Sequence, residues 1–150
     1  MPGGSPSIHH DVKTAGLVLL VVLSAATLFG LYRRRVDGRL HTRTPEPDAP
    51  RLTSSDLGAA LGPRATLVHF STAFCQPCRV ARRILGEVAD TVEGVAHVEV
   101  DAESRLELVR RLDVMRTPTV FVLDRDGRIV RRASGLPRKA DVIAALGEVV

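Results

Sequence analysis

The sequence predicts an α/β domain, with a mixed central sheet covered by helices on both faces, preceded by one N-terminal transmembrane helix. Residues 15–32 carry no charge, which is typical of a membrane span. From about residue 51, apolar runs with strand character alternate with helical patterns. A hairpin signal and a last helical pattern follow, and this order of elements is that of a mixed sheet between two layers of helices.

The chain divides into four segments by composition. Residues 1–14 are rich in Pro, Gly and Ser and predict a disordered tail. Residues 15–32 would form about 27 Å of helix, close to the roughly 30 Å hydrocarbon core of a bilayer. Residues 33–50 form a basic juxtamembrane and Pro-rich linker, in which the three prolines of 44–50 favour a stiff spacer. Residues 51–150 form the folded domain.

A cleavable signal peptide is the alternative for the apolar stretch, with Ser24 and Ala26 as small residues before a cut. Only Lys13 precedes the stretch, whereas five arginines follow it between residues 33 and 43. Because Lys and Arg favour the cytoplasmic side, this asymmetry predicts an N-terminus outside and a cytoplasmic domain in a single-pass membrane protein. An extracytoplasmic domain is the alternative.

The positive charge does not indicate nucleic-acid binding. The net charge is +4, but residues 51–150 hold fifteen Lys/Arg against thirteen Asp/Glu. No basic strand interleaved with aromatic residues of the kind that reads bases is present in the sequence. The expected non-protein partner is therefore the lipid bilayer, through residues 15–32.

The first half of the domain predicts two helices and two strands. Ser54, Ser55 or Asp56 caps a short helix that ends at Gly62–Pro63. A continuous apolar run predicts a buried strand from Ala65 to Phe70. The helix after Cys75 has its apolar stripe at Val80, Ile84 and Val88, flanked by Ala81, Leu85 and Ala89. A second strand runs from Val95 to Val100.

The second half predicts a helix, a hairpin and a last helix. Ser104 and Glu107 form a capping box for a helix whose inner face holds Leu106, Val109 and Leu112. A strand over 120–123 leads through the turn Asp124–Gly127 into a return strand that begins at Ile129–Val130. Gly135 allows a break, and Pro137 starts a last helix that buries Val142, Ile143, Leu146 and Val149.

The two cysteines of the chain form a C-x-x-C pair, Cys75 and Cys78, between a predicted strand and a predicted helix. At a helix N-terminus, unpaired N–H groups and the dipole favour thiolate over thiol. A strand–CxxC–helix context favours a redox pair. Two alternatives remain: a zinc site completed by His69 and His97, and two inert core cysteines.

The domain resembles the thioredoxin family. The resemblance rests on the strand–FCQPC–helix element, the Thr117-Pro118 pair before the penultimate strand, the Asp124–Gly127 turn and Gly135. It covers 51–150 and implies a thioredoxin-like fold in which Pro118 is cis and lies against the cysteines. It also implies that the backbone of Thr117 is presented to substrate, with further contacts from Phe74, Gln76, Pro77 and Gly135.

The resemblance implies a protein-disulfide oxidoreductase without a cofactor. Cys75 attacks a disulfide of a partner protein, and Cys78 then attacks Cys75 and releases the reduced substrate. The partners would be disulfide-containing proteins and a thiol electron donor. The alternatives are an oxidoreductase outside the cytoplasm that acts on secreted proteins or apocytochromes, and a non-catalytic metal-binding module.

Four positions depart from the family pattern. Phe74 replaces the usual tryptophan, Gln76 replaces the usual glycine, His69 takes the place of the buried aspartate, and His97 takes that of its lysine neighbour. A histidine titrates near neutral pH. We therefore hypothesise that His69 accepts the proton of Cys78; the alternative is a neutral histidine of the core.

Overall fold

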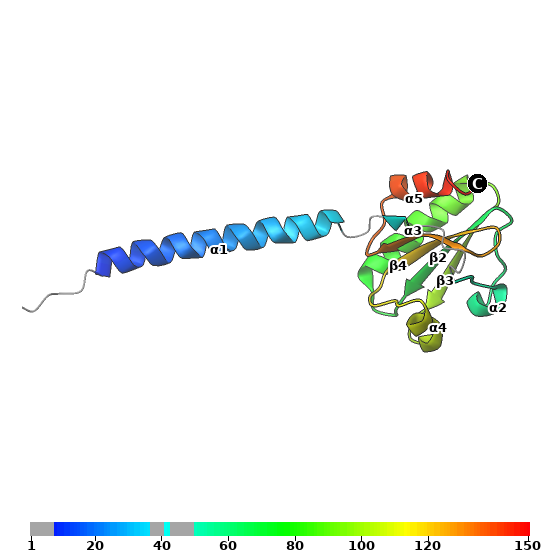
Figure 1. Cartoon of the computed structure of the whole chain (residues 1–150), viewed down its shortest axis with the longest axis horizontal. Helices are drawn as coiled ribbons and strands as arrows, with labels where there is room; N and C mark the ends of the chain where they lie inside the picture. The colour runs from blue at the N-terminus through cyan, green and yellow to red at the C-terminus, as the bar shows by residue number, and fades with distance from the viewer. Residues whose placement is uncertain (1–7, 37–40, 43–49) are drawn as a thin grey trace, which may run out of the picture. The chain divides into compact units, whose positions relative to one another are not determined.

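The structure is a computed structural model that describes residues 8–36, 41–42 and 50–150, with side chains over 14–33 and 50–150. It divides into two compact units, residues 1–36 and 37–150 (Figure 1). The elements are α1 (Ile8–Val36), β1 (His41–Thr42), α2 (Ser54–Leu57), β2 (Ala65–Ser71), α3 (Gln76–Thr91), β3 (Val95–Asp101), α4 (Leu106–Arg111), β4 (Thr119–Asp124), β5 (Ile129–Ser134) and α5 (Lys139–Leu146).

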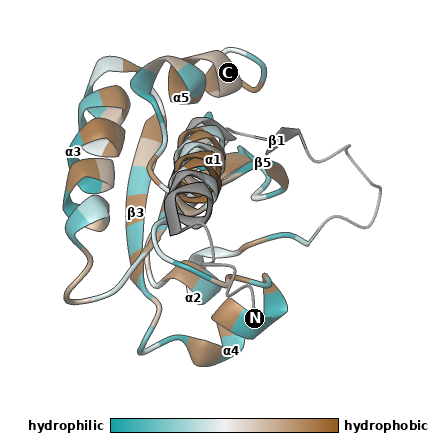
Figure 2. Ribbon diagram, turned by 90° about the vertical axis from the view of Figure 1, so that its left-hand side faces the viewer, coloured by the Kyte–Doolittle hydropathy of each residue, from teal (hydrophilic) through white to brown (hydrophobic). Residues whose placement is uncertain are grey.

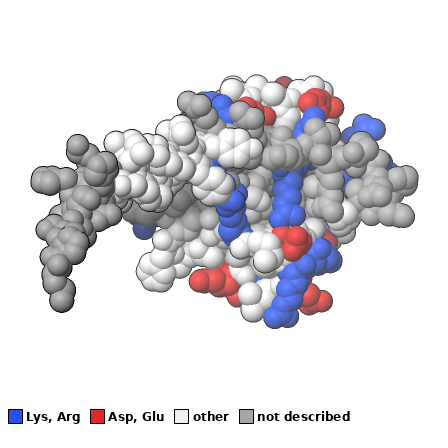
Figure 3. Space-filling view, turned by 60° about the vertical axis from the view of Figure 1, so that its left-hand side comes forward, with Lys and Arg blue, Asp and Glu red and all other residues white. Residues whose placement is uncertain are grey.

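The N-terminal unit is one apolar helix. Over Thr14–Arg33, α1 is long and apolar enough to cross a membrane, a test that a signal sequence also passes. Its middle is hydrophobic in Figure 2 and free of Lys, Arg, Asp and Glu in Figure 3. α1 begins at Ile8, inside the predicted disordered tail, since no proline or glycine interrupts residues 8–15. Residues 1–7 lie outside the described residues.

The second unit is built on a mixed sheet with the strand order β1-β5-β4-β2-β3. β2 pairs parallel with β3, and the other pairings are antiparallel. β1 lies within the segment predicted as a linker and pairs with β5; the Pro-rich residues 44–49 lie outside the described residues. Arg51 forms a single β-bridge to Arg128.

Each face of the sheet carries its own apolar core, because neighbouring strand residues point to opposite faces. α3 and α5 cover one face, and α2 and α4 lie on the other side (Figure 1). The face under α3 and α5 buries Ala65, Leu67, Leu85, Val88, Val120, Val122, Val142, Ala145 and Leu146. The opposite face includes Val68, Phe70, Val98, Val100, Phe121 and Leu123, with an edge-to-face contact between the two phenylalanine rings.

The buried stripe of α3 differs from the prediction. Val80 is exposed and Ile84 only half-buried, whereas the sheet-facing side of the helix consists of Cys78, Ala81, Leu85 and Val88. Cys78 faces the sheet, and the residues three, seven and ten positions after it lie on the same side of the helix and are therefore buried as well. In α5, likewise, Ile143 is exposed rather than buried, and Val149 lies beyond the helix and is half-buried.

Two predicted helix caps are wrong. α2 is capped by Thr53, which forms a capping box with Asp56, and it ends at Gly58 in the left-handed region, well before Gly62. Ser104 does not cap α4: its hydroxyl donates to the carbonyl of Asp101, 3.2 Å away.

The face of α4 that packs on the core also differs from the prediction. Arg105 occupies the N-cap without a side-chain bond, so that Leu108 is buried and Leu106 is exposed. Leu112, just after the helix, is buried as predicted, and Val109 is half-buried.

The predicted hairpin between β4 and β5 is present. The amide of Gly127 donates to the carbonyl of Asp124 (3.0 Å), and Gly127 has a φ of +75°, a conformation that glycine adopts without steric penalty. Its carbonyl accepts from the amide of Leu52 (2.8 Å). The turn therefore fastens the start of the domain to the sheet.

Candidate active site

The cysteine pair lies at the junction between β2 and α3, at the N-terminus of the helix. Cys75 is the N-cap of α3, and its Sγ accepts a hydrogen bond from the amide of Cys78 (3.2 Å). Pro77 fits the first turn, where no N–H donor is required. The N-terminal N–H groups of α3 and its dipole thus point at the Cys75 sulfur, which favours its thiolate when the pair is reduced.

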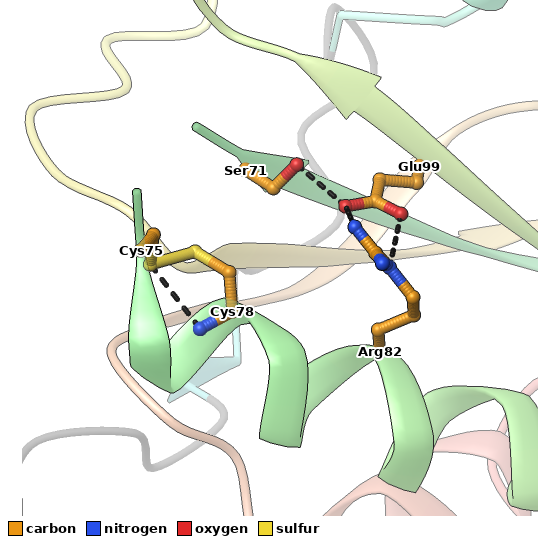
Figure 4. A network of polar contacts seen from close by, with 5 residues as sticks. All are labelled: Ser71, Cys75, Cys78, Arg82 and Glu99. Atoms are coloured by element: carbon orange, nitrogen blue, oxygen red, sulfur yellow. Dashed lines mark hydrogen bonds and ion pairs between the residues drawn. A yellow bond between two sulfur atoms is a disulfide. The ribbon is translucent and has the colours of Figure 1, made fainter. Parts of the chain in front are cut away.

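Cys75 and Cys78 are joined by a disulfide (Figure 4), with their Cα atoms 5.2 Å apart. Their exposure differs: Cys78 is 2% exposed and faces the sheet, whereas Cys75 is half-buried. An incoming molecule therefore reaches Cys75 before Cys78. The bonded pair does not fit the alternative of two inert core cysteines.

Thr117 and Pro118 lie at the same edge of the sheet as the cysteine pair. Phe70 near the end of β2 is opposite Thr119 at the start of β4, and the Thr72 and Thr117 hydroxyl oxygens are 3.3 Å apart. The Thr117–Pro118 peptide bond is cis, and Pro118 is buried. The two loops that flank the disulfide are thus joined at this edge.

The loop before β4 is also held by β5. Arg116 donates to the Ser134 carbonyl (3.0 Å), and the amide of Gly135 donates to the Pro118 carbonyl (2.7 Å). Gly135 has a φ of +98°. Gly135 therefore connects to this loop through its backbone.

Each of the two loops beside the disulfide carries an exposed apolar side chain. Phe74, directly before Cys75, is 96% exposed, and Met115, three residues before Pro118, is 83% exposed. Gln76 and Pro77 are exposed as well. Met115 was missed by the sequence reasoning because its neighbours predict a helix end, and nothing local shows that the side chain stays outside the core.

Beneath the first turns of α3, a polar group interrupts the apolar face of the sheet. His69 on β2 is fully buried, and its ring stacks on that of His97 on β3, with 6.1 Å between centroids. Neither ring nitrogen of His69 has a hydrogen-bond partner. Glu99, in register opposite His69, accepts from Ser71 (2.6 Å).

Arg82, on α3, binds Glu99 from the helix side. Its Nε and Nη2 donate to the two carboxylate oxygens of Glu99, at 2.6 and 2.7 Å (Figure 4). Glu99 and Ser71 were not predicted from the sequence as part of the site. The available signal was strand alternation, which puts Glu99 on the same face of β3 as His97.

The pKa values of His69, His97 and Glu99 all lie below their usual ranges. Burial lowers the pKa of His69 to about 4, while the negative charge of Glu99 raises it and the charges of His97 and Arg82 lower it further. Burial lowers the pKa of His97 as well. The hydrogen bonds from Arg82 hold the pKa of Glu99 below its usual range. At neutral pH the two histidines are therefore neutral beside an ionised carboxylate.

Among the described residues, no group of three or more His, Cys, Asp or Glu side chains could hold a metal ion. The zinc site that sequence reasoning left open for His69 and His97 is therefore not formed in this part of the chain. The cysteine pair is bonded to itself instead.

Comparison with known proteins identifies the same family that the sequence motifs resemble. The thioredoxin family profile matches residues 55–148. The chain is 30% identical to a thioredoxin of Mycobacterium tuberculosis over 88 residues, which cover 58% of this chain and 75% of that protein. It is also 30% identical over 97 residues to human "Thioredoxin domain-containing protein 2"; the match covers 63% of this chain but only 18% of the human protein's length.

Solved structures show the same fold. Chloroplastic thioredoxin z superposes with a TM-score of 0.55 at 22% identity, covering 67% of this chain and 92% of that one. The thioredoxin of Fasciola hepatica gives 0.53 at 24% identity, covering 59% and 84%. With a CxxC pair at disulfide distance in a matching fold, this chain belongs to the thioredoxin family.

Proposed function

We propose that this protein is a membrane-tethered thiol–disulfide oxidoreductase that reduces disulfides of partner proteins. The observation that carries the proposal is the unequal exposure of a bonded pair at a helix N-terminus: Cys75 is accessible and Cys78 is buried. The membership of the thioredoxin family supports it. In this proposal the domain spans about residues 51–150 and the membrane anchor residues 15–32.

In the proposed reaction the Cys75 thiolate attacks one sulfur of a substrate disulfide, and the other substrate sulfur leaves with the electron pair and takes up a proton. Cys78 then loses its proton and attacks the Cys75 sulfur. The bond between Cys75 and the substrate breaks, and the second substrate sulfur leaves and is protonated. The protein ends with the Cys75–Cys78 disulfide and is reduced again by a thiol donor.

We assign substrate docking to the edge where the two loops meet. Thr117 would pair through its backbone with an extended substrate segment, as strand-like recognition requires. Phe74, Gln76 and Pro77 are exposed beside Cys75 and would contact the segment. Pro118 would close the site from the other loop.

We propose that His69 accepts the proton of Cys78. Cys78 lies on the sheet-facing side of α3, and His69 is buried in the sheet beneath the first turns of that helix. A buried imidazole with a low pKa is a weak base, but formation of the Cys78 thiolate beside it favours the imidazolium. The lack of any hydrogen-bond partner on the His69 ring nitrogens supports the proposal, because one nitrogen is free to take a proton.

The test uses the full chain in detergent micelles and reduction of insulin by dithiothreitol. Wild-type protein should accelerate the reaction, whereas Cys75→Ser should be inactive. In a separate mixture without dithiothreitol, pre-reduced Cys78→Ser should accumulate a mixed disulfide with insulin that is stable until reductant is added. Absence of acceleration by the wild type, or a mixed disulfide formed equally by Cys75→Ser, would refute the assignment.

The tether has its own test. The apolar stretch of α1 supports a membrane anchor, and the arginines after it support a cytoplasmic domain. The protein should stay in the membrane fraction at alkaline pH, with its full length retained. In intact cells whose Cys75–Cys78 disulfide has first been reduced, the two thiols should resist a membrane-impermeant maleimide. Labelling would place the domain outside the cytoplasm, and a shortened soluble product would indicate a cleaved signal sequence.

A further inference from the structure

The ion pair between Glu99 and Arg82 lies beside His69, which is fully buried under α3. Glu99 is fixed by three hydrogen bonds, two from Arg82 and one from Ser71. Its Cα is paired in register with His69 on the neighbouring strand, so both side chains leave the sheet on the same face. The carboxylate therefore has a defined place next to the buried imidazole.

Four titratable groups come from the two elements packed on His69. His97 and Glu99 belong to β3, and Arg82 and Cys78 to α3. On the remaining side, the β4 partner of His69 is Val120, which is apolar. With His97 neutral, the field on His69 is set mainly by one negative and one positive side chain that oppose each other.

We propose that Glu99 is a positioning residue of the thiol–disulfide exchange: held by Arg82 and Ser71, its carboxylate favours protonation of His69 and so promotes resolution by Cys78. This inference rests on the proposed function, and within it on His69 as proton acceptor. In the step concerned, the Cys78 proton passes to His69 and the Cys78 thiolate attacks Cys75. The substrate sulfur leaves with the electron pair of the broken bond and takes a proton from solvent, to which His69 returns its own.

Because Glu99 and Arg82 carry opposite charges, the proposal predicts that removing one or the other changes the basicity of His69 in opposite directions. Glu99→Gln removes the negative charge and keeps an oxygen that can accept from Ser71, so the imidazolium is disfavoured and His69 becomes a weaker base. Arg82→Gln removes the positive charge and should make His69 a stronger base. Both substitutions break the same ion pair, so a purely structural contribution would change the rate in the same direction.

The assay separates the two chemical steps. Reduced full-length protein in detergent is mixed with 5,5′-dithiobis(2-nitrobenzoate), which releases one coloured thiolate when Cys75 attacks and a second when Cys78 resolves the mixed disulfide. Near neutral pH, the second phase should slow in Glu99→Gln and quicken in Arg82→Gln, each by roughly threefold to tenfold, because each substitution leaves one of two opposing charges uncompensated beside the imidazole. At high pH, where hydroxide removes the Cys78 proton, the variants should converge.

Arg83→Gln is the matched control, since it removes the same charge from the next position on α3, where the side chain is exposed. It should leave the second phase unchanged. The imidazole signal of His69, followed by NMR through a pH titration, should move to a lower midpoint in Glu99→Gln and to a higher one in Arg82→Gln.

Failure of this inference and failure of the proposed function give different results. A wild-type protein that shows no second phase contradicts the proposed function, while the NMR midpoints still test the action of Glu99 on His69. A wild type with both phases, and Glu99 and Arg82 variants that are unchanged or change in the same direction, overturns the role of Glu99 alone.

Discussion

Acidification should destabilise the folded domain through one buried side chain, His69. In the unfolded chain a histidine takes up a proton below about pH 6.5, whereas burial lowers the pKa of His69 in the folded protein to about 4. Between these values the unfolded state binds more protons than the folded state. The free energy of unfolding therefore falls as the pH falls through this window.

The size of the effect follows from the gap between the two pKa values, about 2.5. Fully developed, it corresponds to about 3.4 kcal/mol at roughly 1.4 kcal/mol per pKa unit. By about pH 4.5, before most carboxylates are protonated, about 2.5 kcal/mol should already be lost. The lowered pKa of His97 acts in the same direction and adds to the loss.

The measurement is guanidinium unfolding of the oxidised full chain in detergent, followed by far-UV circular dichroism from about pH 7 to about pH 4.5. His69→Leu, which cannot take up a proton, should lose about 2.5 kcal/mol less than the wild type over this range. His97→Leu should retain most of the contribution of His69. A wild type whose stability does not change, or a His69→Leu protein that loses as much as the wild type, would contradict a neutral buried His69.

Two further predictions concern local structure and are read as free energies of unfolding near neutral pH. Thr53→Ala removes the side chain that caps α2 and should cost about 1 kcal/mol, while the control Ser55→Ala in the same helix should change little; equal losses would deny the cap its role. Gly127→Ala should cost more than about 1–2 kcal/mol, because φ is +75° and the added Cβ would lie 2.2 Å from the Leu52 carbonyl oxygen. Gly86→Ala, inside α3 with open space around it, should instead stabilise the protein by roughly 0.5–1 kcal/mol, and a loss there would refute the reasoning from backbone conformation.

The sequence alone determined most of the element order and the position of the cysteine pair. The continuous apolar run of β2, the Asp124–Gly127 turn and the uncharged stretch of α1 are local signals, because a few neighbouring residues suffice to specify each of them. A CxxC pair between a strand and a helix is likewise read from adjacent residues. For this reason the fold class and Cys75 and Cys78 could be predicted without coordinates.

Only the tertiary structure decided which way each helix turns and which charges meet. Val80 and Ala81 are both compatible with a buried stripe, and packing of α3 on the sheet buries Ala81. Arg82 and Glu99 are seventeen positions apart and meet because α3 crosses over the parallel pair β2 and β3. Such contacts depend on strand register and helix rotation, which the apolar pattern constrains only loosely, so the surroundings of His69 could not be obtained from the sequence.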